Sequence, residues 1–255
     1  MVKPTELLTR AQREDALRAF TELTTLDRTD VAAHNGKGDC LRVLEDDTGA
    51  FDCYIATLDI DESNLHALHG CAVVRKSQTR LQDSIHYLER ALRVDAGFTD
   101  ARLLLATVHT DLGTRLRSDG QDEAGLASYV KAVEVDPTYA PAHYNLGVVY
   151  GESPAHYNKA LDSYQRAVQY RLPEGYCEAH CNMGVIQKNL GMLEEAVASY
   201  ERSLAANRNF AMARGNLAVA LTDLGTAVKV NKGDHKGARK LYVNKASLAS
   251  LFALN

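Results

Sequence analysis

The chain has 255 residues, of which 45% are hydrophobic and 24% are charged. This composition supports a sizeable folded core and is not typical of an intrinsically disordered protein. The formal net charge of −4 provides no bulk attraction to nucleic acid or to an anionic membrane surface, so we expect neither as a partner.

The N-terminal stretch MVKPTELLTRAQRE lacks the apolar segment of a signal peptide, and no later run approaches the roughly 18 apolar residues of a membrane span. The cysteines are odd in number, and no two have the CxxC spacing of a redox or zinc motif. We therefore expect a protein of the nucleus and cytoplasm in which the cysteines are reduced, small core residues. They are Cys40, Cys53, Cys71, Cys177 and Cys181.

Internal repetition is the strongest pattern along the chain. The stretch YAPAHYNLGVVYGE at 139–152 is echoed 37 residues later by YCEAHCNMGVIQKN, and TDLGT occurs twice, 112 residues apart. These echoes predict one solenoid over residues 1–255, with a partial unit at 1–30 and a divergent last unit at 211–255. The five units between them are 31–64, 65–98, 99–139, 140–176 and 177–210.

Small and large residues recur at fixed places in this frame. The eighth position of each unit is Gly or Ala, and a second small residue is followed four residues later by a large one. Spacings of three, four and seven put these residues on one helix face, where small residues let two helices approach closely. The large residues are Phe20, Tyr54, Leu88, Tyr129, Tyr164 and Tyr200.

A unit of about 34 residues with this code resembles the tetratricopeptide repeat. The resemblance covers nearly the whole chain and is most specific from 99 to 226. It implies an all-α superhelical solenoid of antiparallel helix pairs, in which each unit packs on the next.

Several residues invite a catalytic or metal hypothesis, but their positions favour packing. His34, His143 and His180 fall at equivalent positions of different units, so they do not converge, and CEAHC at 177–181 has no evident fourth ligand. No base or oxyanion partner marks a catalytic cysteine. We expect no catalytic, metal or cofactor-binding residue here. The paired acids Asp46 and Asp47 lie at an expected inter-helix turn and suit an N-cap role. The locally basic stretch 230–240 is expected to be a solvated loop rather than a phosphate site.

Asparagine occupies the sixth position of three consecutive units, as Asn145, Asn182 and Asn216. This position is predicted to face the inner groove of the solenoid. The amide side chain can pair with a peptide N–H and C=O together, so a row of them could hold an extended chain by its backbone. The alternative is that each Asn bonds a neighbouring helix or water.

The two TDLGT segments each introduce about seven extra residues, or two further helical turns. With YAPAHYNLGVVYGE, CNMGVIQKN and ALTDLGT in the same order and spacing, the chain resembles the N-terminal repeats of SPINDLY-type plant protein O-glycosyltransferases. The resemblance implies transfer of a sugar from GDP-fucose or UDP-GlcNAc to Ser or Thr of nuclear and cytosolic proteins, and negative regulation of gibberellin signalling. It also implies an asparagine-lined groove, disordered Ser/Thr-rich partners including DELLA-type proteins, and self-association.

The nucleotide sugar is implied only for a catalytic domain, which the family carries beyond its repeats. We therefore expect no cofactor and no transfer activity in this chain alone. Two alternatives stay open, a stand-alone adaptor and a dimerisation scaffold. An adaptor that clamps an acidic C-terminus would need cations such as Lys37 and Arg75 in its groove.

Overall fold

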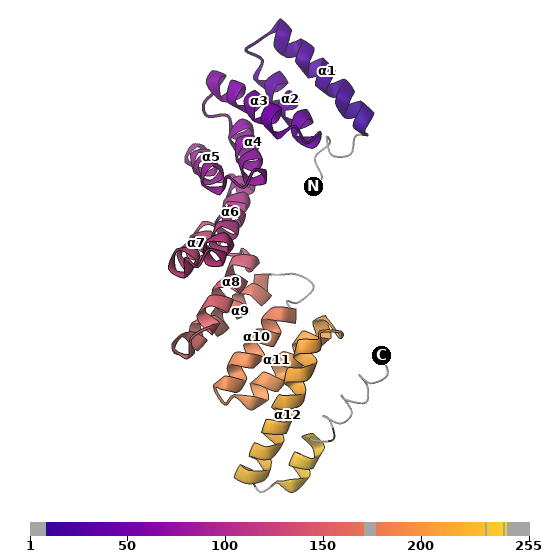
Figure 1. Cartoon of the computed structure of the whole chain (residues 1–255), viewed down its shortest axis with the longest axis vertical. Coiled ribbons are helices and arrows are strands. Elements are labelled where there is room, and N and C mark those ends of the chain that lie inside the picture. The colour runs from indigo at the N-terminus through magenta and orange to yellow at the C-terminus, as the bar shows by residue number, and fades with distance from the viewer. Residues whose placement is uncertain (1–8, 171–176, 233, 242, 244–255) are drawn as a thin grey trace. The chain divides into compact units, whose positions relative to one another are not determined.

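A computed structural model describes residues 9–170, 177–232, 234–241 and 243 (Figure 1). Its regular structure is helical, with no strand among these residues. The predicted all-α class is confirmed. By its internal contacts the chain divides into two compact units, 1–137 and 138–255, which are described separately below.

The first unit contains seven helices in its described part. Successive helices pack against each other, and α2, α4 and α6 also make contacts across the intervening helix. The bounds are α1 Arg10–Leu26, α2 Val31–Val43, α3 Asp47–Ile60, α4 Leu65–Ser77, α5 Leu81–Val94, α6 Thr99–Ser118 and α7 Asp122–Val135.

The second unit follows the same alternation, with α10 contacting both α8 and α12. Its elements are α8 Ala140–Gly151, the short 3₁₀ helix η2 Pro154–His156, α9 Tyr157–Tyr170, α10 Cys177–Asn189, α11 Leu193–Ala206 and α12 Ala211–Lys232. Helices thus begin at 31, 65, 99, 140, 177 and 211, where the sequence period places the unit starts. The organisation into a single solenoid stays a prediction, because the two units are not placed relative to each other.

Capping side chains at the turns explain why the helices begin and end where they do. Asp46 accepts from the backbone N–H of Gly49 at 2.9 Å, which confirms its predicted role as an N-cap. At the other turn, Asp27, Asp61 and Asp95, spaced 34 residues apart, accept from the N–H two residues later at 2.7–3.1 Å. Three successive turns of the first unit therefore carry the same stop signal in the sequence.

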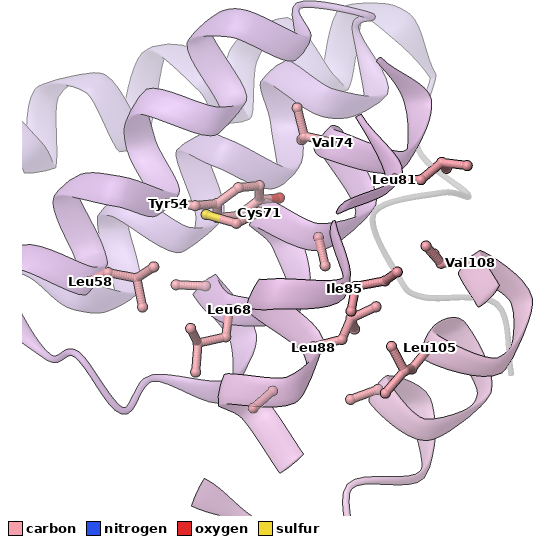
Figure 2. Packing of buried hydrophobic residues seen from close by; sticks show 14 of the residues in the cluster. Tyr54, Leu58, Leu68, Cys71, Val74, Leu81, Ile85, Leu88, Leu105 and Val108 are labelled. Atoms are coloured by element: carbon pink, nitrogen blue, oxygen red, sulfur yellow. The ribbon is translucent and has the colours of Figure 1, made fainter. Parts of the chain in front are cut away.

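Close approach of small and large residues forms the core. The Tyr54 ring is fully buried in the cluster that joins α3, α4 and α5 (Figure 2). A Cβ placed on Gly38 would lie 2.7 Å from this ring, and one on Gly70 would lie 2.6 Å from it. In the second unit, Gly147 and Gly184 approach Tyr164 and Tyr200 at 2.6 and 2.7 Å in the same way. Glycine is required where a helix lies this close to a ring.

The TDLGT segments belong to long helices, as predicted. α6 has 20 residues and α12 has 22, against 13 in α10. The Asp of each segment reaches back to the lysine near the end of the helix two before it. Asp111 lies 3.1 Å from Lys76, and Asp223 lies 3.8 Å from Lys188. Both partners shift by 112 residues between the units, so the repeated sequence carries a repeated contact.

The prediction that 230–240 is a loop is wrong. α12 continues to Lys232, and residues 235–241 are helical. Asp234 caps this helix by accepting from the N–H of Gly237 at 2.8 Å, and Ala238 is buried. The many basic side chains in this stretch led us to expect a loop, although it contains an N-cap and a helix with a buried face. The rest of the predicted last unit, at 242 and 244–255, lies outside the described residues.

Candidate functional site: the asparagine row of the second unit

Three equivalent helices of the second unit carry the asparagine row. Asn145 lies on α8, Asn182 on α10 and Asn216 on α12, and each side chain is half-buried. Asparagine is a poor helix former because its amide competes for backbone hydrogen bonds. Its presence at the middle of three helices therefore requires an explanation from their surroundings.

Only Asn182 is well held by other side chains. Its Nδ2 donates to the Tyr164 hydroxyl at 3.3 Å and lies 3.5 Å from the Tyr144 hydroxyl. Tyr164 is the large residue of the preceding repeat, just as Tyr54 is for Gly70. The sixth position thus faces the preceding repeat, and for Asn182 the structure supports the alternative in which the amide bonds a neighbouring helix.

Asn216 and Asn145 are held less firmly. Among the described residues, the Nδ2 of Asn216 reaches only the Cys181 sulfur, at 3.7 Å, which is a weak acceptor. Tyr200, which takes the place of Tyr164 here, keeps a buried hydroxyl with no partner among the described residues. Asn145 forms no hydrogen bond within the described part of the chain. The three amides therefore differ: Asn182 is hydrogen-bonded to a tyrosine, Asn216 has one weak contact, and Asn145 has none within the described residues.

A parallel row of valines flanks the asparagines. Val148, Val185 and Val219 each lie three residues, about one helical turn, after an asparagine. Val148 and Val185 are half-buried, while Val219 is exposed. The nearby charges of Lys188 and Asp223 are paired with each other. The surface thus presents amide groups beside aliphatic side chains. An extended peptide could bind such a surface through its backbone and its apolar side chains together.

Arg75, one of the two cations invoked for a carboxylate clamp, makes other contacts. The Arg75 guanidinium lies 3.5 Å from the centroid of the Phe51 ring and donates to Gln78 at 2.7 Å. This stacking commits Arg75 to α3 and to its own helix end. Arg75 is therefore not poised to bind a carboxylate in a clamp.

Cysteines and histidines do not assemble into a reactive site in the described part of the chain. No three His, Cys, Asp or Glu side chains there converge to hold a metal ion. All five cysteines are free thiols, and burial raises the pKa of Cys181 and of Cys177, which disfavours the nucleophilic thiolate. His143 packs against Tyr170 at a centroid distance of 5.8 Å, and burial lowers the pKa of His180. Among the described helices none is long and apolar enough for a membrane span.

Comparison with known families identifies the repeats. Models of the tetratricopeptide repeat match residues 5–64, 113–153 and 178–210. The sequence is 40% identical over 165 residues to a protein of Hordeum vulgare named "Probable UDP-N-acetylglucosamine–peptide N-acetylglucosaminyltransferase SPINDLY". That match covers 65% of this chain and 17% of the barley protein. The SPINDLY protein of Arabidopsis thaliana is 44% identical over 98 residues, which are 38% of this chain and 11% of that protein.

Solved structures share the fold. The peptide-binding tetratricopeptide protein YrrB superposes with a TM-score of 0.54 at 20% identity, covering 78% of this chain and 97% of that one. The C-terminal part of a repeat protein from Cytophaga hutchinsonii gives a TM-score of 0.56 at 14% identity, covering 93% and 90% of the two chains. At these identities the likeness concerns the fold alone. The chain matches about a sixth of the length of its barley relative.

Proposed function

We propose that this chain, which is built from tetratricopeptide repeats similar to those of the SPINDLY proteins, is a protein-interaction region that selects substrates for a protein O-glycosyltransferase. The substrate would be an extended, disordered Ser/Thr-rich segment lying along the asparagine row. The transferase part of this proposal rests on the names of the related proteins. The row on α8, α10 and α12 supplies the binding surface.

The observation that carries this proposal is the uncommitted hydrogen-bonding capacity of the row. Within the described part of the chain, Asn145 has no partner, and the Oδ1 atoms of Asn182 and Asn216 accept no hydrogen bond. Each amide could take a peptide N–H on its oxygen, and Asn145 could also donate to a peptide C=O. Backbone recognition of this kind depends little on sequence, as a transferase with many substrates requires.

The reaction and its setting are further parts of the proposal. A nucleotide sugar, UDP-GlcNAc or GDP-fucose, would bind to a catalytic domain outside these repeats. The place of action would be the nucleus and cytoplasm, with DELLA-type proteins of gibberellin signalling among the targets. These assignments derive from the resemblance to SPINDLY proteins, and no residue of this chain is assigned to catalysis.

The test is a triple replacement of Asn145, Asn182 and Asn216 by Ala. Binding of a fluorescein-labelled disordered Ser/Thr-rich peptide would be measured by anisotropy, and helicity by far-UV circular dichroism. Each lost peptide hydrogen bond is worth about 0.5–1.5 kcal/mol, so three sites should weaken binding by about tenfold or more. Asn158→Ala, at an exposed asparagine on α9, is the matched control. Unchanged affinity in a helical triple variant would refute the asparagine groove.

A further inference from the structure

A polar pocket of the first unit is lined by a buried histidine. The pocket has a volume of about 210 Å³ and lies between α5, α6 and α7. His109 on α6 is 5% exposed and forms no hydrogen bond within the described part of the chain, and its Nδ1 is fully buried. Buried polar side chains are normally hydrogen-bonded, so this ring lacks a partner that a fold usually supplies. We call this site the His109 pocket, and its other polar residues are Gln82, His86 and Glu89 of α5 and Ser128 and Lys131 of α7.

The equivalent polar side chain of the second unit does have its partner. Gln187 is the eleventh residue of its repeat, as His109 is of its own. It accepts a hydrogen bond from Ser199 on α11 at 2.6 Å. Ser128 is the counterpart of Ser199 on α7, but it donates to the carbonyl oxygen of Ala124 on its own helix at 2.9 Å. His109 is therefore left without the contact that this position can make elsewhere in the chain.

The cation of the His109 pocket is uncommitted as well. Lys131 is the tenth residue of α7, and it forms no ion pair or hydrogen bond with any described residue. The arginines at the tenth position of α5 and α9 are bound. Arg90 donates to the carbonyl oxygen of Glu62 at 3.2 Å, and Arg166 donates to the Asp162 carboxylate at 2.9 Å. The His109 pocket thus brings together two nitrogen groups that have no acceptor.

The charges around His109 indicate what kind of acceptor is missing. Burial is the main cause that lowers the pKa of His109, and the Lys131 charge lowers it further. Glu89 on α5 and Glu134 on α7 act in the opposite direction, and His86 also faces the pocket from α5. A negatively charged group beside the ring would favour the protonated imidazole and would also neutralise the Lys131 ammonium.

We propose that the His109 pocket binds one carboxylate group, held between the Lys131 ammonium and the His109 imidazole. A carboxylate only accepts hydrogen bonds and has two oxygens, so it can accept from both donors at once. Glu89 lies in the same pocket and disfavours a doubly charged group such as phosphate. The carboxylate could belong to a free small molecule or to an Asp or Glu side chain of another protein.

This site is independent of the asparagine row. The His109 pocket belongs to the first unit and opens between α5 and α7, which are the second helices of their repeats. The asparagines lie on α8, α10 and α12, which are the first helices of repeats in the second unit. The proposal therefore adds a second binding site, and it stands or falls without the proposed function.

The experiment titrates the full chain with sodium acetate and follows the ring signals of His109 by NMR. His109→Gln assigns these signals, and sodium chloride at the same ionic strength is the reference. We expect saturable shifts with a dissociation constant on the order of millimolar, as two charge-assisted hydrogen bonds would give. The blocked tripeptides Gly-Glu-Gly and Gly-Gln-Gly distinguish the sources. Binding of the Glu tripeptide as well as acetate indicates a protein side chain, and binding of acetate alone indicates a free carboxylate.

The affinity for acetate should depend on pH. A bound carboxylate stabilises the imidazolium and so raises the pKa of His109. Proton binding and carboxylate binding then favour each other, and acetate should bind more tightly at pH 5.5 than at pH 7.5. In His109→Gln this dependence should disappear while helicity is kept, because glutamine already occupies the equivalent position at Gln187.

Two charge changes test the identity of the ligand. Lys131→Met should weaken acetate binding by about tenfold or more, because it removes a charge-assisted hydrogen bond. Lys229→Met, at an exposed lysine of α12, is the matched control and should leave binding unchanged. Glu89→Gln should tighten binding, since it removes a negative charge from the pocket. Glu89 is exposed, so this variant tests the proposal even if a change at His109 disturbs the fold.

Three results would overturn the inference. The first is a set of His109 shifts with acetate that are no larger than those with sodium chloride. The second is equal acetate affinity in Lys131→Met and Lys229→Met. The third is weaker acetate binding in Glu89→Gln, which would mean that the pocket does not select a negative charge.

Discussion

Asn182 offers a direct way to separate packing from binding in the asparagine row. Its Nδ2 lies 3.3 Å from the hydroxyl oxygen of Tyr164, a residue that is 2% exposed. Asn182→Ala deprives that buried hydroxyl of its donor. A net hydrogen bond contributes about 0.5–1.5 kcal/mol to stability, and because this bond is long we expect a loss in the lower half, about 0.5–1 kcal/mol.

The measurement is a double-mutant cycle of Asn182→Ala with Tyr164→Phe, using urea unfolding followed by far-UV circular dichroism. If the contact is real, the two changes should not add, and their coupling should be about 0.5–1 kcal/mol. Asn145→Ala is the control, because Asn145 bonds no described residue. It should change stability by less than about 0.5 kcal/mol.

Two results would refute this reasoning. One is a cost for Asn145→Ala as large as that for Asn182→Ala, which would mean that any asparagine at this helix position stabilises the fold. The other is full additivity of the Asn182 and Tyr164 changes, which would mean that the hydrogen bond contributes nothing. In either case the distinction between a packed and an uncommitted amide would fail.

Two further predictions concern packing and pH. Gly184→Val places a side chain where a Cβ would already lie 2.7 Å from the Tyr200 ring, so overpacking should cost about 1–3 kcal/mol; an unchanged urea midpoint would contradict the close approach. His109 is 5% exposed with its Nδ1 unpartnered among the described residues, and burial, reinforced by Lys131, holds its pKa below the ordinary value. As the pH falls, His109 is therefore protonated in the unfolded chain before it is protonated in the folded chain. The free energy of unfolding should decrease as the pH drops below about 6.5, the ordinary histidine pKa. His109→Gln should flatten this slope between pH 7.5 and 5.5, and an equal slope in the variant would exclude His109 as its source.

The fold could be predicted in detail because each repeat packs mainly on its neighbours. The small and large residues that define the period, such as Gly38 and Tyr54, are the same residues that meet in the core. The helix at 235–241 was missed because its signal is only an aspartate cap and one buried alanine, Ala238, among basic residues.

The helices that carry the three asparagines could be predicted from the sequence, but the contacts of each amide could not. A period can place Asn145, Asn182 and Asn216 on equivalent helix faces, and it does so correctly. It cannot say which amide is already occupied, because that depends on the residue that the preceding repeat brings within 3.3 Å, as Tyr164 does for Asn182.

By itself the sequence determined the all-α class, the residues at which the repeat helices begin and the long TDLGT helices, since these follow from local periodicity. The relationship to SPINDLY repeats came instead from the resemblance of particular motifs, YAPAHYNLGVVYGE, CNMGVIQKN and ALTDLGT. Only the tertiary structure decided that Asn182 is packed while Asn145 is uncommitted, that Arg75 stacks on Phe51, and that the buried Nδ1 of His109 has no partner among the described residues. The physical reason is that hydrogen-bond satisfaction and free volume depend on distances between atoms of different repeats. A one-dimensional period fixes which residues are equivalent, but it does not contain those distances.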